Sequence, residues 1–276
     1  MILERRYNLF GYRATFRTNH ARAEALLSGL YVGKADGNER GPLNLYELLH
    51  RPEAPVGEQW AIAVPGLAAH SKPTLGEAMF GIEASMAGDV ARYDHGLFIV
   101  HGAVVYTPQG ALLLSGFSGS GKTTLSLALA ARGFALGGDD MALLDPSTGL
   151  IEPHPRCFHI DPPTDRLVEE LGLHLPADAL RDRFVTPWDL GVASLPPARV
   201  RAVFLLESER VAAPRIVPES QAEAASALLL QVGRGRFSDV EAVRHVAAMT
   251  GSARCFRVWS GELGASVDAV LAAAGS

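Results

Sequence analysis

The sequence predicts an α/β fold built around a mixed sheet. Apolar, β-branched segments, which are typical of buried strands, alternate with segments of helical periodicity along the second half of the chain. Two of the apolar segments flank the turn-forming residues Thr-Pro-Gln-Gly at 107–110 and so predict a β-hairpin. The strands of a hairpin are antiparallel, so the sheet that contains them is not purely parallel.

Composition indicates an ordinary folded protein. Of the 276 residues, 48% are hydrophobic and 20% are charged, a balance that argues against disorder. The formal net charge of -5 argues against general nucleic-acid binding, which needs a basic excess. The two cysteines, Cys157 and Cys255, form no metal or disulfide pattern and are expected to be reduced thiols. The first residues lack the apolar core of a signal peptide, and no apolar run approaches the ~20 residues that cross a bilayer. We therefore expect a cytoplasmic protein without a transmembrane segment.

Two regions are predicted. Residues 1–94 form a small α+β region, and residues 95–276 form a larger α/β domain. In the first region we expect a strand or hairpin over Tyr7–Phe16, a strand over Gln59–Val64, and helices over His20–Leu30 and Leu75–Tyr93. In the second, strands are expected at Leu97–Tyr106, Ala111–Ser115, Phe134–Gly138, Met141–Leu144, Leu150–Ile151, Arg199–Leu206 and Arg254–Trp259. Helices are expected at Thr123–Ala131, Gln221–Val232, Asp239–Met249 and Glu262–Ala274.

The strongest motif is GFSGSGKT at residues 116–123, called the phosphate loop below, which matches GxxxxGK[ST] between an apolar strand and a helix. Its glycines let backbone N–H groups converge on phosphate, and the helix that follows adds the positive end of its dipole. Lys122 is expected to reach the β- and γ-phosphates, and the Thr123 hydroxyl to bind Mg²⁺. The predicted cofactors are ATP and Mg²⁺, and the predicted nucleotide-binding residues in this stretch are Gly116, Ser118, Gly119, Ser120, Gly121, Lys122, Thr123 and Thr124.

An acidic pair, Asp139-Asp140, ends the strand that follows this helix. A carboxylate in that position can hold magnesium or accept a proton from an attacking hydroxyl. Neighbouring strand residues point to opposite faces, so both carboxylates face one site only if the chain turns at Gly137-Gly138. Otherwise the pair is a solvated strand end.

Two further charged residues are candidates for the same site. Glu207 ends the strand Arg199–Leu206 and could bind magnesium, although a strand-end acid in a charged loop is the simpler interpretation. The candidate metal ligands are thus Thr123, Asp140 and Glu207. Arg156 follows the hairpin after the acidic pair and is a candidate phosphate contact.

His101 is placed by hairpin register. If Pro108-Gln109 forms a two-residue turn, Thr107 pairs with Gly110, and counting back pairs His101 with Gly116. An imidazole would then lie beside the nucleotide. The alternative is a histidine whose hydrogen bonds are satisfied within the core.

These residues, in this order, resemble the core of the HPr kinase/phosphorylase family, and more closely its HPr-kinase-related relatives. The resemblance is carried by LFIVHGAVVYTPQGALLLSGFSGSGKTTLSLALAARGFALGGDDMALLD, which holds His101-Gly102, the hairpin, the phosphate loop and the acidic pair. The segment Pro153–Arg156 and the end of the chain, Arg254–Leu271, are similar too. The specific part covers the middle of the chain, and the first third resembles the family only loosely.

The resemblance implies a P-loop kinase core of the type also found in phosphoenolpyruvate carboxykinases, with ATP phosphorylating a serine hydroxyl. It makes residues 95–276 the ATP-binding catalytic domain and residues 1–94 a candidate acceptor-binding region. It implies that Asp139 or Asp140 is the catalytic base, that His101 supports it, and that Lys122 and Thr123 bind phosphate and magnesium. The chain departs from the HPr kinases proper in having Thr123-Thr124 where they have Ser-Glu, and it lacks their glycine-rich Arg-Gly signature. The acceptor is therefore open between a protein, a peptide, and a small-molecule or lipid hydroxyl. A homo-oligomer is compatible with the resemblance.

The sequence supports other nucleotide-dependent functions less well. A transport-type ATPase would need an LSGGQ-like segment, and a GTPase would need an NKxD motif, and neither is found. An ATP-sensing or ATPase module without phosphotransfer remains an alternative, against which the intact Asp139-Asp140 pair argues.

Overall fold

A computed structural model shows a chain made of two units. The first unit comprises Met1–His95 and Arg156–Ala193, and the second comprises Gly96–Pro155 and Ser194–Ser276. The division predicted from the sequence cuts the chain once, near residue 94, whereas in the structure the segment 156–193 clusters with the first unit. The structure describes residues 1–31, 43–93, 95–159, 162–173, 175–187, 189–191, 195–233 and 237–275.

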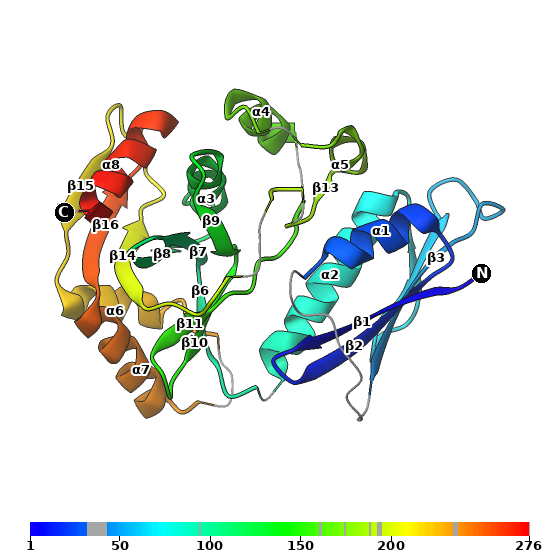
Figure 1. The fold of residues 1–276 in the computed structure, drawn as a ribbon, viewed down its shortest axis with the longest axis horizontal. Coiled ribbons are helices and arrows are strands. Elements are labelled where there is room, and N and C mark those ends of the chain that lie inside the picture. The colour runs from blue at the N-terminus through cyan, green and yellow to red at the C-terminus, as the bar shows by residue number, and fades with distance from the viewer. Residues whose placement is uncertain are drawn as a thin grey trace. The chain divides into compact units, whose positions relative to one another are not determined.

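The first unit is built on a five-stranded sheet with two helices on one face (Figure 1). The strands, in spatial order, are β1 (Leu3–Leu9), β2 (Tyr12–Thr18), β3 (Asn44–His50), β4 (Trp60–Ala63) and β5 (His70–Lys72). Only the β2–β3 pair is parallel. Helices α1 (Ala21–Gly29) and α2 (Leu75–Arg92) bury their apolar sides against this sheet, and Thr74 caps α2 by accepting a hydrogen bond from the Glu77 N–H. The resulting core holds Phe16, Tyr46 and Met79.

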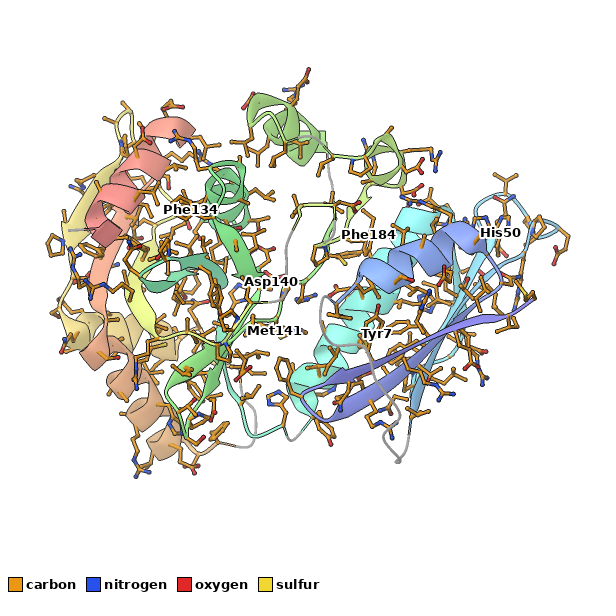
Figure 2. The ribbon with its side chains drawn as sticks, in the orientation of Figure 1. Tyr7, His50, Phe134, Asp140, Met141 and Phe184 are labelled. Carbon is orange, nitrogen blue, oxygen red and sulfur yellow. The ribbon has the colours of Figure 1, made fainter. Side chains whose placement is uncertain are left out.

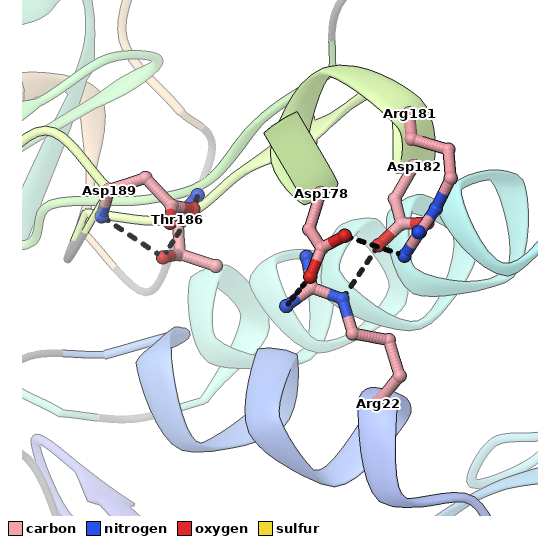
Figure 3. Close-up of polar contacts among 6 residues, drawn as sticks. All are labelled: Arg22, Asp178, Arg181, Asp182, Thr186 and Asp189. Atoms are coloured by element: carbon pink, nitrogen blue, oxygen red, sulfur yellow. Dashed lines mark hydrogen bonds and ion pairs between the residues drawn. The ribbon is translucent and has the colours of Figure 1, made fainter. Parts of the chain in front are cut away.

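The returning segment 156–193 adds β12 (Phe158–His159), α4 (Pro162–Glu170), α5 (Ala177–Asp182) and β13 (Phe184–Val185). Strands β12 and β13 pair with each other. Arg22 of α1 donates to Asp182 at 2.8 Å and lies 3.9 Å from Asp178, so α5 is fastened to α1 by charge (Figure 3). Phe184 is fully buried in the core of the first unit. These contacts explain why the segment clusters with the N-terminal unit.

Arg156 is held within the first unit by a buried ion pair. Its Nε and Nη2 atoms donate to the two carboxylate oxygens of Glu83 on α2, at 2.7 and 2.8 Å. The side chains of Arg156 and Glu83 are only 11% and 1% exposed. A two-point pair of this kind is strong and directional, because the planar guanidinium matches the carboxylate. The side chain therefore has a structural partner here.

Breaking this pair is expected to destabilise the first unit. In Glu83→Gln the Arg156 guanidinium keeps its burial but loses its charged acceptor, which should lower the free energy of unfolding by about 2 kcal/mol. Urea unfolding followed by circular dichroism measures the change. The matched control is Glu24→Gln, whose partner Arg5 is 50% exposed, and which should cost less than about 1 kcal/mol. Equal effects of the two substitutions would show that burial does not strengthen the Glu83 pair.

The second unit is built on a six-stranded mixed sheet. Its strands, in spatial order, are β15 (Arg215–Pro218), β16 (Arg254–Trp259), β14 (Val200–Leu206), β8 (Gly110–Ser115), β7 (Ala103–Thr107) and β9 (Ala135–Gly138). Strands β16, β14 and β8 are parallel, and the outer pairings are antiparallel. Helices α3 (Lys122–Ala131) and α8 (Leu263–Gly275) pack together on one side of the sheet. Helices α6 (Gln221–Leu229) and α7 (Asp239–Ser252) pack together on the other (Figure 1).

A small antiparallel sheet lies beside the large one in the same unit. It consists of β6 (Phe98–His101), β10 (Met141–Asp145) and β11 (Leu150–Glu152), in the order β11-β10-β6. The apolar side chains of both sheets share one core with α6 and α7, which includes Phe98, Leu113, Val203 and Val246. The chain therefore crosses from the small sheet to the large one directly before it enters the hairpin and the phosphate loop.

The structure confirms the α/β class and the mixed character of the sheet that carries the phosphate loop. The hairpin turn is confirmed as well, because Thr107 pairs with Gly110. Cys157 and Cys255 are free thiols, and burial raises the pKa of the Cys255 thiol to about 11. No helix in the described part of the chain is long and apolar enough to cross a membrane.

Candidate functional site

The phosphate loop joins the carboxyl end of β8 to the amino end of α3. Gly121 is the N-cap of α3 and has φ 92°, a left-handed conformation that glycine adopts without strain. Gly116 is required by close packing, because a Cβ there would lie 2.5 Å from the carbonyl oxygen of Leu206 on β14. The first glycine thus lets the loop run against the neighbouring parallel strand, and the last one starts the helix toward which a phosphate would be drawn.

Lys122 lies across its own loop. Its Nζ donates to the carbonyl oxygens of Gly116 and Phe117, at 2.9 and 3.1 Å, and the residue is 6% exposed. Burial lowers the pKa of Lys122, and the negative charges of Asp140 and Asp139 partly oppose that shift. The ammonium is therefore desolvated at the centre of the loop, within the field of both carboxylates.

Ser120 supplies a second polar group inside the loop. The residue is 4% exposed, and its Oγ lies 2.8 Å from the position of a Cβ on Gly116. Within the described ranges this hydroxyl has no hydrogen-bond partner. A buried hydroxyl without a partner is costly, and phosphate oxygens bound in the loop would supply the missing acceptor.

Asp139 is tied directly to the loop helix. Its Oδ2 accepts a hydrogen bond from the Thr123 hydroxyl at 3.2 Å, and its Oδ1 lies 3.5 Å from the hydroxyl oxygen of Ser126. Ser126 is fully buried and also donates to the carbonyl oxygen of Thr123 at 3.0 Å. Asp139 itself is only 9% exposed. The sequence motif did not point to Ser126, although its spacing of three residues from Thr123 places it on the same face of the helix.

Asp140 differs from its neighbour in being exposed. Its carbonyl oxygen accepts hydrogen bonds from the His101 ring, whose protonated Nδ1 lies 3.0 Å away, and from the Gly102 N–H at 3.2 Å. Figure 2 shows Asp140 at the end of β9, next to Met141, where β10 begins. The turn between the two strands lets the acidic residues leave the regular alternation of a strand, and His101 fixes the backbone at that turn.

The predicted hairpin register holds as far as Ala103, which pairs with Leu114, but the predicted pairing of His101 with Gly116 is wrong. His101 belongs to β6 and pairs with Met141 of the small sheet instead of continuing the hairpin ladder to Gly116. The ladder ends because the chain leaves the large sheet at Gly102, whose N–H is used by Asp140. His101 still lies near the phosphate loop, because the hydroxyl of Ser115, the residue before the loop, donates to the His101 carbonyl at 2.9 Å.

The side chains of Glu207 and Arg156 each have another partner in the structure. The Glu207 carboxylate pairs with Arg257, which also donates to Glu219 at 2.5 Å. Both carboxylates raise the pKa of Arg257, and the hydrogen bond that Arg257 donates to Glu207 is the largest cause. Arg156 pairs with Glu83 in the first unit. The assembled site therefore consists of the loop 116–123, Asp139, Asp140, His101 and Ser126.

Comparisons with known proteins add no assignment to this geometry. A scan against protein-family models finds no match, and a search of curated proteins finds no significant one. In the part of the chain that the structure describes, no three or more His, Cys, Asp or Glu side chains cluster as a metal site.

Proposed function

We propose that this protein is an ATP- and magnesium-dependent kinase that transfers the γ-phosphoryl group to a hydroxyl, with a serine of a protein or peptide as the acceptor. The observation that carries the proposal is the hydrogen bond from Thr123 to the buried Asp139. It connects the residue type that binds magnesium in phosphate loops to a carboxylate one strand away. The resemblance of residues 97–145 to the HPr kinase/phosphorylase family supports the same reaction and a P-loop kinase core of that type.

The chain's own groups fit a magnesium-bound triphosphate. The amides of the loop, the Lys122 ammonium and the Ser120 hydroxyl, which has no partner among the described residues, would hold the phosphates. Thr123 would hold magnesium through its hydroxyl, with Asp139 orienting that hydroxyl. When bound, the ion supplies charge neutralisation of the phosphate oxygens. Binding would also give Lys122 phosphate oxygens in place of the carbonyl groups of Gly116 and Phe117.

The two aspartates are proposed to have different roles. Asp139 is buried and accepts a hydrogen bond from Thr123, so its proposed role is to orient the hydroxyl that binds magnesium. Asp140 is exposed and its backbone is held by His101, so its carboxylate is the base. In the reaction the acceptor oxygen forms a bond to the γ-phosphorus, the bond from that phosphorus to the bridging oxygen of ADP breaks, and the hydroxyl proton passes to Asp140.

Phosphate transfer from labelled ATP tests this proposal. The chain is incubated with ATP labelled in the γ-phosphate, magnesium and a cell lysate or a metabolite pool, beside an Asp139→Asn, Asp140→Asn double variant. We expect label in a specific protein or peptide that the double variant does not produce. Label in a small molecule or lipid would show that the protein is a kinase whose acceptor belongs to another class. Release of phosphate alone would indicate an ATPase, and binding without turnover would indicate a sensor, and either result would contradict the kinase.

A further inference from the structure

The loop that follows β14 lies beside the phosphate loop. Strand β14 is the parallel neighbour of β8, and Leu205 pairs with Ser115 at the ends of the two strands. The carbonyl oxygen of Leu206 is so close to Gly116 that a Cβ on that glycine would lie 2.5 Å from it. Residues 207–211 therefore leave the sheet at the same edge as the phosphate loop, as expected for the carboxyl ends of parallel strands.

This loop is anchored at both ends. The N–H of Glu207 donates to the Val258 carbonyl at 2.9 Å, and the N–H of Val211 donates to the Ser260 carbonyl at 3.0 Å. The Glu207 side chain is taken up by Arg257 of β16. Three attachments across five residues hold the segment between them in place, so a side chain on it is presented in a defined direction.

Arg210 on this loop points to the start of the phosphate-loop helix. Its Nη2 atom lies 3.8 Å from the position of a Cβ on Gly121, the N-cap of α3. Arg210 is exposed, and in the described ranges no carboxylate pairs with it. Glu209 directly precedes Arg210 and is exposed, and the carboxylate of Glu207 is engaged by Arg257.

This placement brings a third positive group to the start of α3. The amino end of α3 carries partial positive charge, and Lys122 adds a full one at its first turn, which the negative charges of Asp140 and Asp139 partly balance. A guanidinium added to these raises the local potential further, so the arrangement favours an anion between the three groups. The buried Ser120 hydroxyl, which has no partner in the described ranges, lies in the same loop and also calls for an acceptor.

We infer that Arg210 is a phosphate-binding residue that contacts the polyphosphate of the bound nucleotide from the β14 side. The inference rests on the proposed function, because it concerns the same nucleotide. A guanidinium suits the role since its planar fork can bind two oxygens of one phosphate and remains charged at any physiological pH. Because Arg210 comes from a different strand, it adds a contact that the GxxxxGK[ST] motif does not contain.

Equilibrium binding of MgATP, MgADP and inorganic tripolyphosphate tests Arg210. We expect Arg210→Ala to weaken the binding of MgATP and of tripolyphosphate by about 10- to 100-fold, the effect of losing a charge-assisted hydrogen bond. Arg210→Lys keeps the charge but not the planar fork, so its affinities should fall between those of the wild type and Arg210→Ala. The matched control is Arg201→Ala, an exposed arginine at the opposite end of β14 beside Gly110, which should bind like the wild-type chain. If MgADP is weakened as much as MgATP, the contact is to the α- or β-phosphate, and if it is not, the contact is to the γ-phosphate.

The outcomes separate this inference from the proposed function. In one outcome Lys122→Ala loses MgATP binding, while Arg210→Ala binds MgATP and tripolyphosphate within about twofold of the wild type. That difference is too small for a charge-assisted hydrogen bond, so the Arg210 inference would be overturned and the proposed kinase function would stand. If the wild-type chain binds neither MgATP nor tripolyphosphate, the proposed function fails and the inference with it. The unfolding midpoint of Arg210→Ala should match that of the wild type, because the side chain is exposed.

Discussion

Replacing Lys122 by alanine is expected to lower the affinity for MgATP by at least about 100-fold, equivalent to about 2.7 kcal/mol. The ammonium is 6% exposed and is bonded to two loop carbonyls, so it is already directed into the cradle that the phosphates would occupy. Its partial dehydration strengthens each charge–charge contact there. Titration calorimetry measures the loss directly.

The same substitution should leave the fold intact. Burial lowers the pKa of Lys122, which means that the folded chain disfavours its charged form relative to water. Removing the ammonium therefore relieves a desolvation cost while it removes two hydrogen bonds, and the unfolding midpoint should move little. Lys72→Ala, on β5 in the first unit, is the control with the same change of charge. Unchanged MgATP affinity in Lys122→Ala would show that the phosphate loop does not bind the nucleotide.

Asp140→Asn is expected to slow phosphoryl transfer by about a thousandfold, within the range found for a lost general base. Asparagine keeps the size of the side chain and leaves the backbone contact with His101 in place. It cannot accept the hydroxyl proton, so the rate should fall while MgATP affinity stays within about threefold, because ground-state binding does not use the base. Asp268→Asn, at an exposed position of α8, is the control.

Asp139→Asn should behave differently, which makes the comparison informative. Thr123 would lose a charged acceptor next to the proposed magnesium position, and such changes cost about 10- to 100-fold in metal affinity. The variant should therefore recover part of its rate at high magnesium, whereas Asp140→Asn should not. Recovery of Asp140→Asn by magnesium, with none for Asp139→Asn, would exchange the roles assigned to the two residues.

Local patterns predicted much of the second unit. The phosphate loop, the hairpin turn and the helix that begins at Lys122 each depend on residues close in sequence, and glycines and turn formers mark them clearly. Ser126 could have been found from its helical spacing to Thr123 together with the Asp139 that follows.

Contacts between distant segments could not be predicted in this way. Arg210 meets the loop only because β14 is the parallel neighbour of β8, a pairing of strands about 90 residues apart that no local pattern encodes. Arg156 follows a hairpin of the second unit, yet the chain crosses to the first unit there and the side chain pairs with Glu83. The register of His101 failed for a similar reason, because Gly102 marks a change of sheet rather than one long strand.

The central claim, that a magnesium-bound triphosphate occupies the loop at residues 116–123, is tested most directly by following the backbone amide signals of the isotope-labelled chain by nuclear magnetic resonance during a MgATP titration. The amides of Gly119, Gly121, Lys122 and Thr123 should shift strongly and saturate together, because N–H groups that gain phosphate acceptors change their environment most. The carbonyl signals of Gly116 and Phe117 should move as Lys122 leaves them. Binding of MgATP that leaves these signals unchanged, or no binding at all, would contradict the account.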